Sequence, residues 1–166
     1  MEFRSGDDVI HPGYGLGNVV RLEEKQLAGT ELCWYYVLAI GTATVWVPMR
    51  SDGSTTLRAV TSKHELNQYR TLLKSRPTIL ERDHKQWRLD MNARLNQGSF
   101  RTLCEVVRDL TALGWYRPIG EVDARLLNKV RDNLCREWAA AAGLSINEAT
   151  DEVDALLLAG RETYRA

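Results

Sequence analysis

The first part of the chain alternates short apolar runs with turn residues. The runs predict five strands, at residues 8–10, 17–23, 32–40, 44–48 and 57–60. Clusters of turn residues separate them, as in Ala28-Gly29-Thr30. Five short strands at this spacing are typical of a small barrel or a curled sheet.

The third predicted strand has no clearly polar face. Side chains alternate across a strand, so Trp34, Tyr36 and Leu38 share one side. Tyr35 and Val37 share the other side. One side is expected to be core, and the other would expose an aromatic and an aliphatic residue. Either these residues and the tryptophan of the next strand complete a small core, or a partner or the following domain covers them.

From residue 61 onward the apolar spacing becomes helical. Ser62 and Glu65 form a capping box, which predicts a first helix over residues 62–74. A second amphipathic stretch predicts a helix from about Leu80 to Asn96. Ser99 caps a third helix, which carries an apolar stripe.

Two glycines are placed to end helices in the left-handed conformation. Gly98 follows the second predicted helix, and Gly143 follows a long fourth one over about residues 121–142. Between the third and fourth helices, the residues from Gly114 to Pro118 predict a loop that contains Trp115, Tyr116 and Arg117.

A second capping box, Ser145 with Glu148, predicts a fifth helix that runs to about Leu157. The pattern as a whole predicts the α+β class. A five-stranded barrel over residues 1–61 is followed by a helical bundle over residues 62–166.

The glycine-rich opening could be confused with a phosphate-binding loop. A dinucleotide motif must follow a strand and open a helix, whereas Gly13, Gly15 and Gly17 lead into the strand-like residues 18–22. We therefore interpret this stretch as a β-hairpin corner, where glycine permits a tight reversal or a close backbone approach.

Composition narrows the classes of function. The chain has 166 residues and 44% hydrophobic content, enough to build a core. No apolar run approaches the roughly 20 residues that span a bilayer, and the N-terminus does not have the pattern of a signal peptide. We expect a globular cytoplasmic protein without membrane contact.

Cysteine and histidine usage argues against metal chemistry. Cys33, Cys104 and Cys135 are far apart and lie in apolar patterns, so we expect buried free thiols. The three histidines have no ligand-like spacing, and no serine or cysteine lies in a nucleophile elbow. The sequence therefore predicts no metal, no cofactor and no enzymatic activity.

The formal net charge is zero, but the charge is unevenly distributed. Residues 74–136 hold thirteen Lys and Arg against eight Asp and Glu, whereas residues 137–166 hold two against six. A basic face is what phosphate binding requires, although a solvated helix surface gives similar counts.

Four stretches together resemble a known family. They are the opening Phe3-x-x-Gly6-Asp7-x-Val9-Ile10-His11-Pro12-x-Tyr14-Gly15-x-Gly17-x-Val19, the pair Val45-Trp46-Val47-Pro48 and Leu57-Arg58, and Glu105-Val106-Val107-Arg108-Asp109-Leu110. They resemble the CarD/CdnL family of bacterial transcription regulators. The opening alone is shared with the polymerase-interacting domain of the transcription-repair coupling factor. The stretch from Glu105 to Leu110 and the helical second half point to CarD/CdnL.

The resemblance implies that each of the two domains binds a different partner. The Tudor-like, or SH3-like, barrel would dock on the β subunit of RNA polymerase through strand edges. Lys25, Tyr35 and Trp46 are the candidate contacts, and better-known members carry arginines at the positions of Lys25 and Trp46. The helical domain would reach promoter DNA at the upstream edge of the transcription bubble.

The resemblance also implies a DNA site, from which this sequence departs. Well-studied members wedge a tryptophan into the minor groove. That position falls here on His84, and Trp87 lies one helical turn later, so either residue could be the wedge, or the wedge is lost and Trp87 belongs to the core. The family's basic position in the fourth helix falls on Ala124. The candidate phosphate ligands are Arg88, Arg94, Arg125 and Lys129.

The resemblance thus implies a non-enzymatic transcription regulator, a monomer that reaches the nucleoid through RNA polymerase. The alternative is a protein-interaction adaptor that uses the barrel edge and does not bind DNA. The sequence leaves open whether the regulator activates or represses, and which promoters it serves.

Overall fold

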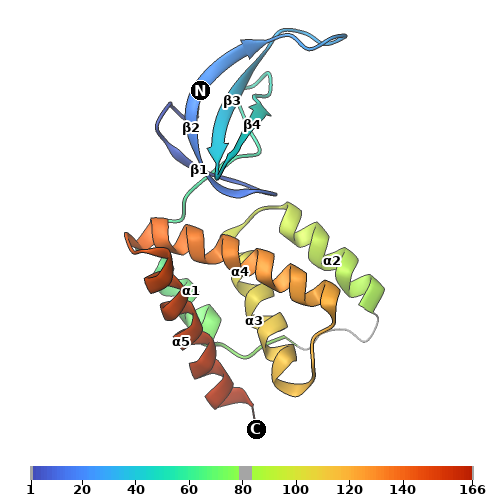
Figure 1. Ribbon diagram of the computed structural model, residues 1–166, viewed down its shortest axis with the longest axis vertical. Helices are drawn as coiled ribbons and strands as arrows, with labels where there is room; N and C mark the ends of the chain where they lie inside the picture. The colour runs from blue at the N-terminus through green and yellow to red at the C-terminus, as the bar shows by residue number, and fades with distance from the viewer. Residues whose placement is uncertain (1, 79–83, 166) are drawn as a thin grey trace. The chain divides into compact units, whose positions relative to one another are not determined.

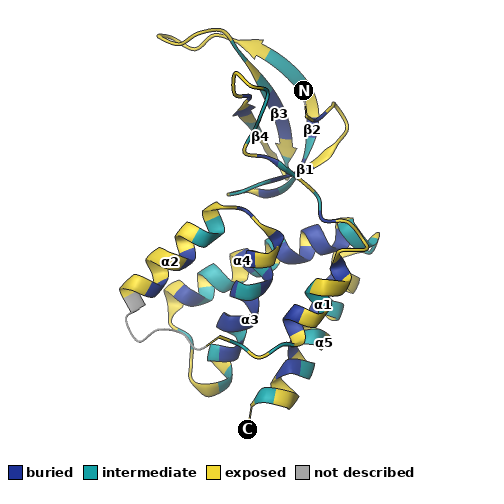
Figure 2. Cartoon of the chain, turned by 180° about the vertical axis from the view of Figure 1, so that it is seen from behind, coloured by how far each residue is buried: buried dark blue, intermediate teal, exposed yellow. Residues whose placement is uncertain are grey.

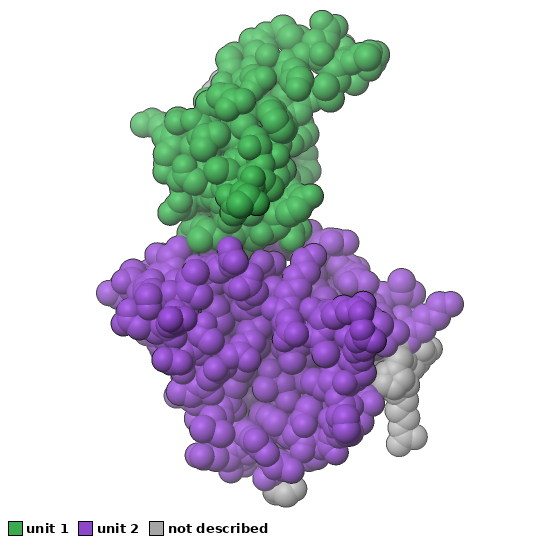
Figure 3. Space-filling model, viewed as in Figure 1, with its two compact units in different colours: residues 1–60 green, residues 61–166 purple. Residues whose placement is uncertain are grey.

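A computed structural model describes residues 2–78 and 84–165 of the chain. Within this part, a five-stranded antiparallel sheet precedes five helices, which confirms the predicted α+β class (Figure 1). The chain divides into two compact units, residues 1–60 and residues 61–166 (Figure 3). We call them the β unit and the helical unit, and the division lies one residue before the expected boundary.

The sheet of the β unit has the strand order β4-β3-β2-β1-β5. The strands are β1 (Asp8–His11), β2 (Gly15–Lys25), β3 (Cys33–Ile40), β4 (Ala43–Pro48) and β5 (Arg58–Ala59). Neighbouring strands are antiparallel. Among the described strands, β4 and the two-residue β5 therefore form the sheet edges.

The corner between β1 and β2 is the predicted hairpin turn. Gly15 has a φ of 81°, which favours glycine. At Gly17 a Cβ would lie 2.6 Å from the Cγ1 of Ile40, so only glycine allows this close approach. The Nδ1 of His11 accepts hydrogen bonds from the backbone N–H groups of Gly13 (3.0 Å) and Tyr14 (3.1 Å).

The core of the β unit lies on one side of β3, as the alternation predicts. Tyr36 and Leu38 are fully buried, and the Tyr36 hydroxyl accepts the backbone N–H groups of Glu2 (3.0 Å) and Phe3 (3.3 Å). Trp34, expected on the same side, is 40% exposed. The expectation that Val37 is exposed is wrong. Val37 is fully buried, and Trp46 lies directly opposite it on β4.

Among its described residues the helical unit contains five helices, several of which have the predicted ends. They are α1 (Leu66–Lys74), α2 (His84–Asn96), α3 (Phe100–Tyr116), α4 (Glu121–Ala142) and α5 (Ile146–Tyr164). The capping box of Ser145 and Glu148 is confirmed, and Gly98 and Gly143 adopt left-handed conformations. The bonds between Ser62 and Glu65 form, but α1 begins only at Leu66.

Two helix boundaries correct the sequence prediction, and one lies outside the described residues. The predicted loop between the third and fourth helices starts too early, because α3 continues through Trp115 to Tyr116 and the loop begins at Arg117. Gly114 instead leaves room for Ile119, whose Cδ1 would be 3.2 Å from a Cβ at this position. Helix α5 extends beyond Leu157 to Tyr164. The predicted start of the second helix near Leu80 falls outside the described residues.

The core of the helical unit draws on all five helices. Figure 2 shows the buried sides of α1, α3, α4 and α5, whereas α2 is largely exposed. Four charged residues among those described are buried in this unit, Arg108, Asp109, Asp123 and Glu137. Glu137 on α4 is 1% exposed, and its Oε2 accepts the backbone N–H (3.0 Å) and the hydroxyl (2.8 Å) of Thr61. The carboxylate thereby ties the first residue of the unit to α4.

All three cysteines are free thiols, as expected. Cys104 and Cys135 are buried, and Cys33 is half-buried. Burial raises the pKa of the Cys104 thiol well above its usual value and also raises the pKa of Cys135. Within residues 2–78 and 84–165, no helix is long and apolar enough to cross a membrane.

Candidate functional site

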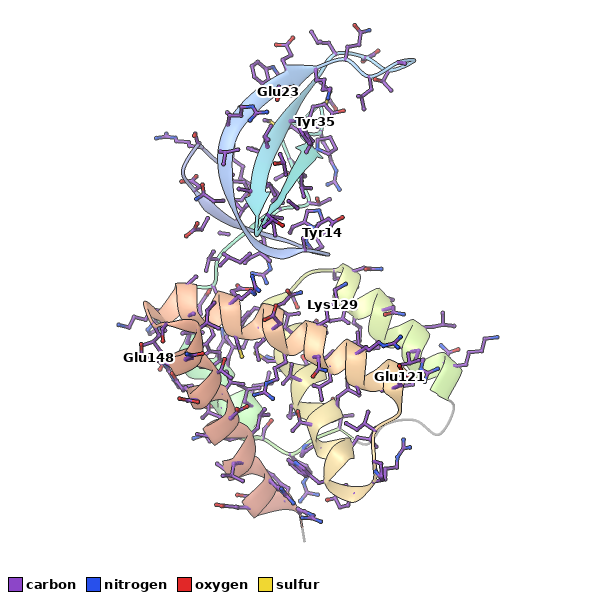
Figure 4. All side chains as sticks on the ribbon, viewed as in Figure 1. Tyr14, Glu23, Tyr35, Glu121, Lys129 and Glu148 are labelled. Atoms are coloured by element: carbon purple, nitrogen blue, oxygen red, sulfur yellow. The ribbon has the colours of Figure 1, made fainter. Side chains whose placement is uncertain are left out.

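The three candidate polymerase contacts lie on one face of the sheet. Tyr35 pairs with Glu23 on β2 and with Pro48 on β4, and directly opposed residues share a face. Trp46 lies two residues before Pro48, on the same face. We call the surface formed by Arg21, Glu23, Lys25, Tyr35 and Trp46 the outer sheet face (Figure 4 labels Glu23 and Tyr35).

Charged groups surround the Trp46 ring on the outer sheet face. The Lys25 Nζ lies 5.3 Å from the ring centroid, within range of a cation–π interaction. The indole Nε1 donates to the Glu23 Oε2 at 3.4 Å, and that oxygen also lies 3.1 Å from an Arg21 guanidinium nitrogen. The hydrogen bond from Trp46, together with Arg21, holds the pKa of Glu23 below its usual value. Trp46 still remains 42% exposed.

The outer sheet face borders an open strand edge. In the described part of the chain β4 pairs with β3 alone, so the backbone groups along its other side are free to pair with another strand. Pro48 ends this edge because proline has no N–H to donate. The arrangement combines an exposed aromatic side chain with a short, unpaired β edge.

Sequence reasoning missed two members of this surface. Arg21 and Glu23 lie opposite Val37 and Tyr35 of β3, on the same side of β2 as Lys25. The period of two along the strand could have revealed them. Glu23 matters because it contacts both the indole and the guanidinium.

The structure places Trp87 in the core of the helical unit. Its side chain is 6% exposed and belongs to the buried cluster together with Met91. The indole Nε1 is buried without a hydrogen-bond partner in the described structure. In this arrangement the ring presents no surface that could enter a DNA groove. His84 is the first residue of α2, and its side chain lies outside the described structure.

The candidate arginines are held by carboxylates. The Arg88 Nε lies 3.3 Å from an oxygen of Asp123, a residue that is 6% exposed. Arg94 on α2 pairs with Glu105 on α3 at 2.8 Å. Ion pairs therefore join α2 to α4 through Arg88 and to α3 through Arg94. Both guanidinium groups have a carboxylate partner.

On α4 the candidate cations share one exposed face. Arg125 pairs with Glu121 one turn earlier, and Lys129 follows one turn later (Figure 4 labels Glu121 and Lys129). Lys129 is exposed. The structure thus brings Arg125 and Lys129 together. It pairs Arg88 and Arg94, both on α2, with carboxylates of two other helices.

The described residues include no group of three or more His, Cys, Asp or Glu side chains that could hold a metal ion. Two surfaces carry exposed candidate residues: the outer sheet face with the β4 edge, and the exposed faces of α2 and α4.

Comparison with known proteins identifies the family. Residues 69–154, more than half of the chain, match the CarD C-terminal domain. The chain belongs to the CarD family. It is also similar to the Bacillus subtilis (strain 168) protein named "Putative transcription factor YdeB", with 23% identity over 145 residues, which cover 86% of this chain and 94% of that protein. CarD-family membership supports a role in transcription regulation.

Proposed function

We propose that this CarD-family chain is a non-enzymatic regulator that binds the β subunit of bacterial RNA polymerase through its β unit. The observation that carries the proposal is the exposed Trp46, flanked by Lys25, beside the open edge of β4. Tryptophan is enriched in the centres of interfaces, and an open edge can accept a partner strand. Tyr35 extends the same face toward β2.

Hydrogen exchange tests where the polymerase binds. A fragment of the β subunit, added to the full chain, should slow exchange along β4 and leave β5, the opposite edge, unchanged. Strand addition protects backbone amides directly, so the effect should centre on residues 43–47. Protection confined to the helical unit would contradict the proposed surface.

We propose further that the helical unit contacts promoter DNA near the upstream edge of the bubble. The candidate contacts are Arg125 and Lys129 on the exposed face of α4, together with the start of α2 at His84. The excess of Lys and Arg over residues 74–136 supports this assignment. In this proposal Arg88 and Arg94 hold α2 in place and do not contact DNA, because their guanidinium groups already have carboxylate partners.

The salt dependence of DNA binding tests this contact. Each phosphate that a cation neutralises contributes roughly 0.9 to the slope of log K against log salt. Lys129→Ala should therefore lower the slope by about 1. Lys63→Ala, at an exposed lysine before α1, serves as the control and should leave the slope unchanged. Equal slopes for wild type and Lys129→Ala would exclude Lys129 from the contact.

A second candidate function is an adaptor that binds protein partners and not DNA. The ion pairs of Arg88, Arg94 and Arg125 favour it, because they neutralise much of the charge that DNA would require. The adaptor predicts binding of the β subunit with no salt-dependent retention on promoter DNA. The regulator predicts both.

A further inference from the structure

Helix α2 lies at the border of the helical unit in both ribbon views (Figures 1 and 2). The expectation that this helix is amphipathic is wrong for residues 84–96, because its apolar residues form no continuous stripe. It buries Trp87 and Met91, whereas Leu89 is 58% exposed. An apolar face of this size gives limited stabilisation, so other contacts must fix the position of the helix.

Glu105 on α3 provides one such contact at the C-terminal end of α2. Its Oε2 accepts a hydrogen bond from Arg94, in the last turn of α2, at 2.8 Å. Its other oxygen pairs with Arg101 at 3.1 Å. The Glu105 side chain is only 23% exposed, so solvent screens these pairs less than it screens a pair on the open surface.

Arg108 and Asp109 provide a second contact, on the segment that leaves α1 toward α2. The Arg108 guanidinium binds the Asp109 carboxylate (2.8 Å), the Ser75 hydroxyl (2.9 Å) and the Thr78 hydroxyl (3.2 Å). The same Asp109 oxygen accepts the backbone N–H of Thr78 at 2.9 Å. Both side chains are buried, with 10% and 4% exposed.

These contacts fix the position of the backbone that they bind more than they stabilise the fold. A buried ion pair gives little net stabilisation, but removal of one partner leaves an uncompensated charge in the interior. The planar guanidinium also fixes three acceptors at once, which a lysine ammonium on a flexible chain cannot reproduce. The network therefore restricts the Ser75–Thr78 segment to one arrangement.

We propose that Glu105, Arg108 and Asp109 form a clamp that holds the C-terminal end of α2 and the Ser75–Thr78 segment that precedes this helix in the chain. All three belong to the motif Glu105-Val106-Val107-Arg108-Asp109-Leu110, whose apolar members lie in the core. The clamp explains why one helix carries both charged and apolar members of the motif. Its link to DNA rests on the proposed function, because α2 begins at the candidate DNA contact His84.

The test compares clamp variants with a core variant of equal global stability. Arg108→Lys keeps the positive charge but loses the planar guanidinium that binds three acceptors. Thr78→Val removes only the hydroxyl, and it serves as a milder variant if Arg108→Lys does not fold. Val153→Ala, at a fully buried position on α5, is the control. The measurement is the hydrogen-exchange rate of the α2 amides in the full chain, compared between variants that have the same unfolding midpoint.

We expect the clamp variants to speed α2 exchange by roughly tenfold relative to Val153→Ala, with α5 exchange equal in all of them. Exchange in α2 that is no faster than in the control would overturn the clamp. Promoter DNA affinity, measured in parallel, should fall in the clamp variants alone. A wild type that does not bind DNA would overturn the proposed DNA contact, and the exchange result would still decide the clamp.

Discussion

Two tryptophans of the helical core provide a matched test of the burial of Trp87. Trp87 and Trp138 belong to the same buried cluster, with 6% and 0% exposed. They differ in their indole N–H groups. The Trp87 Nε1 has no partner among the described residues, whereas the Trp138 Nε1 donates to the Glu152 carboxylate at 3.3 Å. Phenylalanine at either position removes the same atoms.

The magnitude follows from the two hydrogen-bonding states. An unsatisfied buried donor costs about 1–3 kcal/mol, so Trp87→Phe removes an unfavourable contribution of that size. A hydrogen bond to a charged group contributes about 1.5–3 kcal/mol, so Trp138→Phe loses a favourable one. Trp138 also lies near the Arg70 guanidinium and the Phe100 ring, so any extra packing loss at Trp138 acts in the same direction. The two contributions add, so Trp138→Phe should destabilise the helical unit by roughly 2.5–6 kcal/mol more than Trp87→Phe.

Urea unfolding of the full chain, followed by circular dichroism at the helical minimum, measures this difference. The helical signal reports the helical unit, since the β unit contributes little to it. Equal losses of stability in the two variants would refute the reasoning. That result would mean that the Trp87 indole is either exposed or hydrogen-bonded, and it would restore Trp87 as a candidate for insertion into DNA.

Three further predictions concern single groups. Thr61→Val removes the hydroxyl that donates to the buried Glu137 and should cost about 1.5–3 kcal/mol in the urea unfolding of the helical unit; an unchanged midpoint would contradict this. Burial lowers the pKa of His11, and its Nδ1 accepts two backbone N–H groups. The melting temperature of the β unit should therefore be highest above pH 6.5, the usual pKa of histidine, and should fall as the pH drops below that value. The His11→Asn variant should not show this pH dependence. A thiol reagent should label Cys33 before the buried Cys104, and the reverse order in mass spectra would contradict the burial pattern.

Local signals predicted much of the fold. The Ser145 capping box and the left-handed Gly143 mark helix ends because they satisfy backbone groups within a few residues of the chain. Alternation along β3 likewise placed Tyr36 and Leu38 in the core. The error at Gly114 shows the limit of such signals, because that glycine serves the approach of Ile119 rather than a turn.

The candidate site was less predictable because it depends on partners far apart in the sequence. Lys25 and Trp46 meet through strand register, and the role of Glu23 between them follows only from that register. The arginines of α2 were identified by charge alone. Their pairing with Asp123 and Glu105 depends on how three helices pack, which the charge pattern does not contain.

The central claim is that the outer sheet face and the β4 edge bind the β subunit of RNA polymerase. Titration calorimetry of the full chain with a β-subunit fragment tests it most directly, with Lys25→Ala combined with Trp46→Ala as the variant. Tyr14→Ala, which removes a 60% exposed aromatic outside that face, is the control. We predict that the double variant weakens binding by roughly tenfold or more and that the control binds as wild type does. Undiminished binding by the double variant, or no binding by wild type, would contradict the account.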